Sequence, residues 1–194
     1  MSHLYNALGR ALVFGAAVAL SACGGSSSSS NSVSTPGVDN GVEQPVDGNV
    51  DTLRFILLGD GGSGSDGAYA VGQAIEKVCA ARGCDLVLGL GDNIYESGVS
   101  SVMDSQFEEK FEQPFAPVDL PFYFVLGNHD NTEFFGGDGA GNANGDFQVD
   151  YHYRDSEHPD APRASDRWKM PDRYYRFTQG QQENGQPLVE FFAI

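Results

Sequence analysis

Three apolar stretches of the sequence end in the same way, in a glycine followed by a residue capable of chemistry. Residues 53–58 lead to Gly59-Asp60, residues 86–90 to Gly91-Asp92 and residues 121–126 to Gly127-Asn128. Short apolar runs of this kind are typical of buried parallel strands, and open α/β sheets bind ligands at the ends to which such strands point. The pattern predicts one site, made of Asp60, Asp92, Tyr95, Asn128, His129 and Asp130.

These residue types favour metal-assisted phosphoryl chemistry. Carboxylate, phenolate and amide oxygens are hard ligands, and the two oxygens of Asp92 allow it to bridge two cations. Two metal ions about 3.5–4 Å apart clamp a phosphoryl group and activate a bound water. A phenolate from Tyr95 would favour Fe(III). We expect His129 to face the substrate and Asp130 to orient His129.

The segments between the three strands predict the helices of βαβ units. Residues 66–81 have helical spacing and stop before Gly83. Residues 102–115 repeat the arrangement, and Pro114 ends that helix. The predicted inward side chains are Ala70, Val71, Ala74, Ile75 and Val78 in the first helix, and Val102, Met103, Phe107 and Phe111 in the second.

The N-terminal part of the chain indicates export. Residues 1–22 have a basic start and an apolar core, and they run into Leu20-Ser21-Ala22-Cys23, which resembles a bacterial lipoprotein cleavage box. The resemblance implies a lipid on Cys23 and anchoring to a membrane that faces the periplasm or the cell exterior. A soluble secreted protein is the alternative. Residues 23–51 are rich in Gly and Ser and predict a disordered tether, which leaves 52–194 as the folded domain.

The charge of the chain argues against some classes of binding partner. The formal net charge of −16 argues against nucleic acid and anionic lipid surfaces, which require basic patches. Metal ions would reverse the sign locally, so a phosphate-bearing substrate stays compatible. In an exported chain, Cys79 and Cys84 favour a disulfide over two free thiols. Oligomeric state is left open.

The three strand-end motifs resemble the first three motifs of the calcineurin-like metallophosphoesterases, in order and in spacing. These motifs are Gly59-Asp60-Gly61-Gly62, Gly91-Asp92-Asn93-Ile94-Tyr95 and Gly127-Asn128-His129-Asp130. Tyr95 and the later segment 167–175 narrow the resemblance to purple, tartrate-resistant-type acid phosphatases. The likeness covers about residues 52–194.

The resemblance implies a dinuclear centre of Fe(III) and a divalent Fe, Zn or Mn ion. Asp60 and Tyr95 would ligate Fe(III), Asp92 would bridge, and Asn128 would ligate the divalent ion. His129 would stabilise the transition state or protonate the leaving group, with support from Asp130. The implied reaction is hydrolysis of a small phosphomonoester or phosphoprotein at acid pH.

The implied fold is a β-sandwich flanked by helices (αββα), with only its N-terminal half in this sequence. The family completes its metal site with three histidines on later motifs, and this sequence has none in that pattern. His152 and His158 are expected in an exposed polar loop, and residues 188–194 predict an apolar strand with an unpaired edge. We therefore expect an inactive N-terminal fragment. The alternative is a non-catalytic lipoprotein that retains the scaffold.

Two other stretches of the sequence resemble ligand-binding patterns. Residues 59–64 fit a loose dinucleotide-binding fingerprint, but no acidic residue ends the next strand at the required distance. Residues 136–146 resemble a calcium loop without the glycine and glutamate positions of an EF-hand, so a mobile loop beside the active site is the preferred interpretation.

Overall fold

The computed structural model describes residues 52–131, 140–154 and 166–194. The predicted signal (1–22), the predicted tether (23–51) and His158 lie outside the described residues. Within the described part of the chain, no helix has the length and apolar character needed to cross a membrane.

A parallel sheet confirms the three predicted strands. Its strands are β1 (Phe55–Leu58), β2 (Leu86–Gly89), β3 (Phe122–Phe124) and the short β4 (Trp168–Lys169), in the order β1-β2-β3-β4. All three strands of the prediction therefore point the same way, and their polar ends meet at one edge of the sheet. The sequence analysis did not predict β4.

The first predicted helix is present as α1 (Asp66–Arg82) and ends at Gly83, whose φ of 76° suits a glycine. Its buried face is not the predicted one. Val71 and Val78 are exposed, whereas Ala68, Gly72 and Ile75 are buried, the last as predicted. Gly72 explains the difference, because a Cβ there would lie 2.1 Å from the carbonyl oxygen of Pro114. The helix packs on the face that contains Gly72, because its backbone can approach the segment around Pro114 most closely there.

The second predicted helix is much shorter than residues 102–115. The chain turns around Asp104, which caps the following residues, and a π-helical segment η1 (Glu108–Glu112) follows. Val102, Phe107 and Phe111 are buried as predicted. Met103 was predicted to point inward, and this was wrong: the side chain is 50% exposed because it lies in the turn before the helix.

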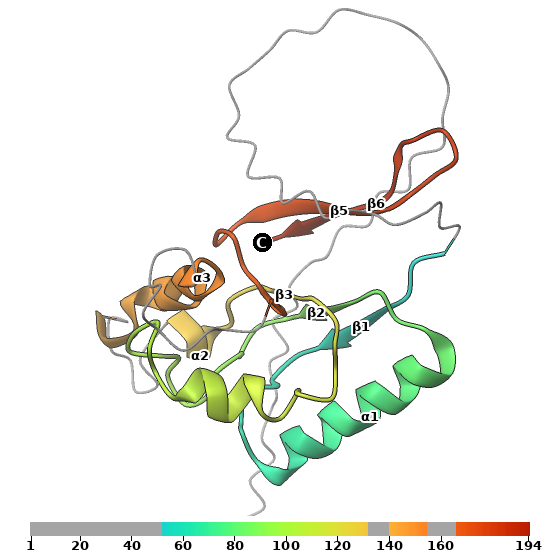
Figure 1. The fold of residues 1–194 in the computed structure, drawn as a ribbon. Helices are drawn as coiled ribbons and strands as arrows, with labels where there is room; N and C mark the ends of the chain where they lie inside the picture. The colour runs from blue at the N-terminus through green and yellow to red at the C-terminus, as the bar shows by residue number, and fades with distance from the viewer. Residues whose placement is uncertain (1–51, 132–139, 155–165) are drawn as a thin grey trace, which may run out of the picture.

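Between β3 and β4, the described part of the chain forms three short helices. They are α2 (Asn128–Asn131), η2 (Ala140–Gly145) and α3 (Asp146–His152). Figure 1 shows α2 and α3 at the end of the sheet toward which β1–β3 point. The predicted exposed loop at His152 was wrong: this residue ends α3, is partly buried, and bonds through Nδ1 to the carbonyl of Trp168 at 3.3 Å.

A second, antiparallel sheet contains β5 (Tyr175–Gln181) and β6 (Pro187–Ala193). The strand predicted over 188–194 is therefore present, and it pairs with β5 along one edge. Figure 1 shows this hairpin on one side of the parallel sheet and α1 on the other.

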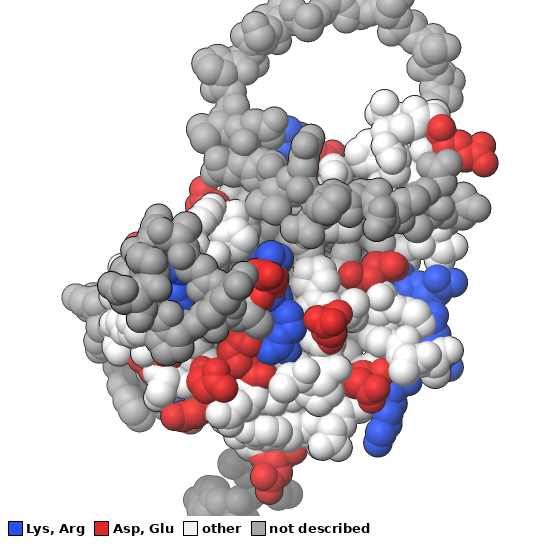
Figure 2. Space-filling view, in the orientation of Figure 1, with Lys and Arg blue, Asp and Glu red and all other residues white. Residues whose placement is uncertain are grey.

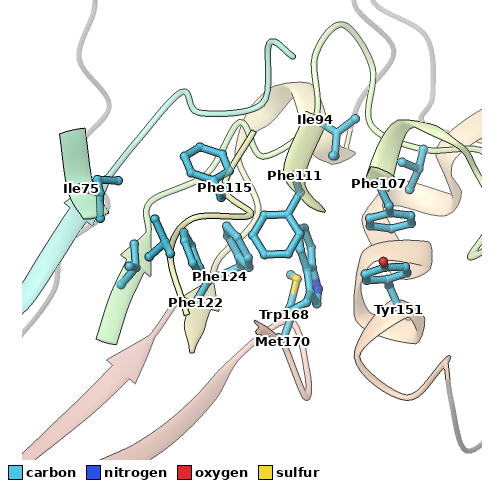
Figure 3. Close-up of a cluster of buried hydrophobic side chains, with 13 residues drawn as sticks. Ile75, Ile94, Phe107, Phe111, Phe115, Phe122, Phe124, Tyr151, Trp168 and Met170 are labelled. Carbon is cyan, nitrogen blue, oxygen red and sulfur yellow. The ribbon is translucent and has the colours of Figure 1, made fainter. Parts of the chain in front are cut away.

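Two apolar cores follow from the alternation of side chains along the strands. Val87, Phe122 and Phe124 face the helical side, where they join an aromatic cluster around Phe111 and Trp168 (Figure 3). The opposite face packs against the β5–β6 hairpin through Leu86, Leu88, Tyr123, Tyr175, Phe177, Phe191 and Ala193. The sheet is thus buried on both faces, which fixes the strand register and with it the placement of the strand-end residues.

The disulfide predicted between Cys79 and Cys84 is present. It joins the last turn of α1 to the start of β2.

Candidate metal centre

Asp60 and Asp92 occupy strained backbone positions directly after β1 and β2. Their φ angles of 57° and 52° lie in the left-handed region, which non-glycine residues seldom adopt. Such strain persists only where the surroundings enforce it, and it concentrates at functional sites. Here the amide of Asp60 donates to the carbonyl of Gly91 at 3.1 Å. The two aspartates are thereby held in neighbouring turns.

The loops after β1 and β2 are in direct backbone contact. The amide of Gly62 donates to the carbonyl of Asp92 at 3.3 Å, and the amide of Tyr95 donates to the carbonyl of Gly62 at 3.0 Å. A Cβ on Gly62 would lie 2.0 Å from the carbonyl oxygen of Asn93, so only glycine fits there. This contact places Tyr95 over both aspartates.

The phenol of Tyr95 joins the two carboxylates. Its oxygen lies 2.7 Å from Oδ1 of Asp60 and 2.9 Å from Oδ2 of Asp92, so its single proton is shared between them. Partial burial, the two hydrogen bonds and the two negative charges all raise the pKa of Tyr95 above its ordinary value. Three oxygens that carry or can carry negative charge therefore converge on one point.

The turn after β3 brings the third motif against Asp92. The amide of His129 donates to Oδ1 of Asp92 at 3.0 Å. Gly127 is equally close, since a Cβ there would lie 2.2 Å from the same oxygen. Asn128, between these two residues, therefore begins α2 immediately beside the carboxylate of Asp92.

The imidazole of His129 is held on the outer side of this cluster. Its ring centre lies 4.5 Å from that of Tyr95, and its Nδ1 lies 2.7 Å from the carbonyl oxygen of Glu96. Because a carbonyl oxygen only accepts hydrogen bonds, Nδ1 carries the proton in this contact.

Asp130 accepts hydrogen bonds from the loops after β2 and β3 and from α3. Its side chain is fully buried (0% exposed) and accepts four hydrogen bonds of 2.8–3.0 Å, from the amides of Asn93, Ile94 and Gly127 and from Nε2 of Gln148. Burial raises the pKa of Asp130, while the four donors oppose that shift. Asp130 thus connects the second motif to the third.

Two residues near the site were missed by sequence reasoning. Gln148 on α3 is fully buried beside Asp130, and Nζ of Lys110 contacts the carbonyl of Tyr95 and Oε1 of Gln106. Burial lowers the pKa of Lys110. No local pattern marks either residue, because the contacts that bring them to the site, with Asp130 and with the carbonyl of Tyr95, join separate segments of the sequence.

The donor set fits a hard cation. The phenol oxygen of Tyr95 lies within hydrogen-bond distance of one carboxylate oxygen of Asp60 and one of Asp92, so a cation bound there would replace the shared proton. This fit depends on the phenol of Tyr95 together with two carboxylates. Among the residues that the structure describes, no group of three or more His, Cys, Asp and Glu side chains is placed to hold a metal ion.

Comparison with known proteins identifies the family. The model of the calcineurin-like phosphoesterases matches residues 53–188, which include all three motifs. The chain belongs to this family of metallophosphoesterases. Within it, the chain is related to the tartrate-resistant and purple acid phosphatases.

Curated relatives agree with this placement. Tartrate-resistant acid phosphatase type 5 from Oryctolagus cuniculus is 34% identical over 140 residues, which cover 68% of this chain and 37% of that protein. The Homo sapiens protein of the same name is 31% identical over the same shares. Purple acid phosphatase 17 from Arabidopsis thaliana is 37% identical over 82 residues, 41% of this chain and 24% of that one. The chain spans little more than a third of the first two relatives.

A solved structure supports the fold. The protein described as GAP50, the anchor in the inner membrane complex of Plasmodium, superposes with a TM-score of 0.50 at 19% identity, over 71% of this chain and 39% of that one. At this identity the likeness shows the α/β fold alone.

Proposed function

We propose that this chain forms the metal-bearing N-terminal part of a dimetal-dependent phosphomonoesterase of the acid phosphatase type. The observation that supports the proposal most strongly is that carboxylate oxygens of Asp60 and Asp92 both lie within 2.9 Å of the phenol oxygen of Tyr95. That convergence occurs in the strand-end motifs of a phosphoesterase family. The proposed substrate class is a small phosphomonoester or a phosphoprotein.

The oxygen ligands divide between two proposed metal positions. Asp60 and Tyr95 would hold Fe(III), Asp92 would contribute to both positions, and Asn128 would hold a divalent Fe, Zn or Mn ion. When bound, such a pair supplies a metal-activated hydroxide and neutralises charge on the phosphoryl group. The three histidines that the family adds from later motifs are not in this sequence, so the chain alone holds four of the seven proposed ligands.

His129 is the proposed general acid. Its Nδ1 donates to the carbonyl of Glu96, so the opposite nitrogen, Nε2, is the one that would transfer a proton to the leaving oxygen. Asp130 would contribute by fixing the turn on which His129 lies.

The remaining organisation is proposed on the same basis. The two sheets and the helices over the parallel sheet fit the first half of an αββα sandwich. Residues 1–22 would direct export, Cys23 would carry a lipid, and residues 23–51 would tether the domain 52–194 outside a bacterial membrane. These assignments rest on the sequence of the N-terminal segment.

A non-catalytic lipoprotein is the second candidate. The fold is compatible with it, because a scaffold of this kind does not by itself require catalysis. Both candidates predict the same scaffold, so they differ only in whether the oxygen cluster binds metal and supports turnover.

Hydrolysis of p-nitrophenyl phosphate separates the candidates. The full-length product of the gene, loaded with Fe(III) and Zn²⁺, should hydrolyse this substrate at acid pH, and Asp92→Ala should lower kcat at least about 100-fold because it removes a ligand of both proposed positions. Asp119→Asn, an exposed aspartate outside the site, is the matched control and should retain activity. Equal rates for Asp92→Ala and the unsubstituted protein would favour the scaffold.

A further inference from the structure

Gln148 connects the two loops that carry the proposed metal ligands. Its side chain is fully buried (0% exposed) although glutamine is usually exposed. Its Nε2 donates to Oδ1 of Asp130 at 2.8 Å, and its Oε1 accepts from Nδ2 of Asn93 at 3.1 Å. Asn93 follows the proposed ligand Asp92, and Asp130 lies two residues after the proposed ligand Asn128.

Gln148 makes one hydrogen bond to Asp130 and one to Asn93, and these two partners fix the direction of each bond. Asp130 receives N–H groups on both oxygens, so the Gln148 atom beside it is the amide nitrogen. Nδ2 of Asn93 also donates to the carbonyl of Val125 at 2.8 Å, so the Asn93 atom facing Gln148 is likewise a donor. The side-chain amide of Gln148 presents its oxygen as acceptor to Asn93 and its nitrogen as donor to Asp130.

Gln148 is itself held rigidly. Its backbone carbonyl accepts a hydrogen bond of 3.0 Å from Nε1 of the buried Trp168 on β4. On the same helix, the ring of Tyr151 stacks on Phe107 with centres 3.7 Å apart. Helix α3 therefore presents the amide from a packed surface, which is the arrangement that a supporting residue of a metal site requires.

We propose that Gln148 is a positioning residue that sets the separation between the loop bearing Asp92 and Tyr95 and the turn bearing Asn128. The inference rests on the proposed function in so far as it predicts metal affinity. Its structural part, the coupling of the two loops, holds in the metal-free chain.

Two substitutions test the coupling. Gln148→Met keeps the length of the side chain and removes both hydrogen bonds, and Gln148→Glu keeps the shape but faces Asp130 with a carboxylate. In the metal-free chain, hydrogen exchange of the amides of Asn93, Ile94 and Gly127 should become at least about 10-fold faster in both variants, because these amides depend on Asp130 staying in place.

Metal affinity is the second readout. Fe(III) binding, followed by the visible tyrosinate-to-iron absorption, should weaken by about 10- to 100-fold, as is usual when a residue that supports metal ligands is replaced. The absorption maximum should also move, which a loss of global stability alone does not cause. If Gln148→Glu does not fold, the results for Gln148→Met alone decide whether Gln148 has this positioning role.

Tyr175→Phe is the matched control. It removes a buried hydrogen bond of 2.8 Å to the carbonyl of Phe124, on the face of the sheet that packs against the β5–β6 hairpin. It should leave the exchange of the three amides and the Fe(III) affinity within about twofold of the unsubstituted chain. Exchange rates in Gln148→Met equal to those in Tyr175→Phe would overturn the inference.

The two readouts separate the inference from the proposed function. If the unsubstituted chain binds no Fe(III), the proposed metal centre fails, and the exchange rates alone decide whether Gln148 couples the loops. If Fe(III) binds equally well in Gln148→Met and in the unsubstituted chain, the positioning role fails and the metal centre stands.

Discussion

The carboxylates of the three motifs differ in what they do, although they look alike in the sequence. Asp60 and Asp92 share the proton of Tyr95, whereas Asp130 is buried and surrounded by N–H donors. Neighbouring backbone decides between these roles, because the amides of residues 93, 94 and 127 all point at residue 130.

Replacing Asp130 should destabilise the fold more than replacing an exposed aspartate. In Asp130→Asn, an NH₂ group would face N–H donors and leave buried groups unpaired, so we expect a loss of about 3 kcal/mol in the free energy of unfolding. Urea denaturation of the metal-free chain measures it. The exposed Asp119→Asn should change stability by less than about 0.5 kcal/mol, and an equal effect in both variants would contradict the assignment.

His152 makes the stability of the fold depend on pH. Partial burial lowers the pKa of His152, with a further lowering by the charge of Lys169, although the hydrogen bond to the carbonyl of Trp168 opposes both. The unfolded chain therefore binds a proton more readily, and this residue's contribution to stability falls as the pH drops below its model-peptide value of 6.5.

Comparing the unsubstituted chain with His152→Gln at about pH 5 and about pH 7.5 tests this direction. The urea midpoint of the unsubstituted chain should drop more on acidification than that of the variant. A larger drop in His152→Gln would show that the assigned direction is wrong.

At the scale of elements, the close contact of α1 with the segment around Pro114 helps to place the helix against the sheet. The contact depends on Gly72, where a Cβ would meet backbone atoms rather than a movable side chain. Gly67, on the same helix, offers a comparison because the nearest atom to its Cβ would be Oγ of Ser65 at 3.4 Å.

The two glycines should respond to alanine in opposite directions. Gly72→Ala should lower the free energy of unfolding by about 2 kcal/mol, because the helix must move away from the core. Gly67→Ala should raise it by about 0.5 kcal/mol, since alanine loses less backbone entropy in a helix. Thermal unfolding of both variants measures the difference, and stabilisation by Gly72→Ala would refute this packing.

The same contact shows how far sequence reasoning reaches. Strands β1–β3, the bounds of α1 and the disulfide follow from local patterns, because apolar runs and a glycine stop signal act over a few residues. The buried face of α1 did not follow, since it is set by Gly72 meeting Pro114 across the fold. Gln148 was missed for the same reason: its burial depends on Asp130 and Asn93, which lie in other motifs.

At the scale of the whole molecule, charge limits what the protein binds. Figure 2 shows acidic and basic side chains interspersed on the visible face, some of them in contact, and the chain as a whole has a net charge of −16. A cation at the cluster of Asp60, Asp92 and Tyr95 would offset charge where two carboxylates already approach one phenol oxygen.

Metal binding should therefore stabilise the whole fold. A ligand that binds only the folded state adds about 2.7 kcal/mol at 100 times its dissociation constant. We expect the melting temperature to rise when Fe(III) and Zn²⁺ are added. It should return to the value of the metal-free chain when a chelator removes the metal ions. Asp60→Asn should abolish most of the rise, and a rise of full size in that variant would place the metal elsewhere.

The central claim is that Asp60, Asp92 and Tyr95 form an iron site, and titration with Fe(III) under visible spectroscopy tests it most directly. The account predicts a tyrosinate-to-iron absorption that saturates at one iron per chain and is absent from Tyr95→Phe. The control variant Tyr69→Phe, in α1, should keep it, because the phenol of Tyr69 donates to Gln113. An absorption that persists in Tyr95→Phe, or no absorption in the unsubstituted chain, would contradict the claim.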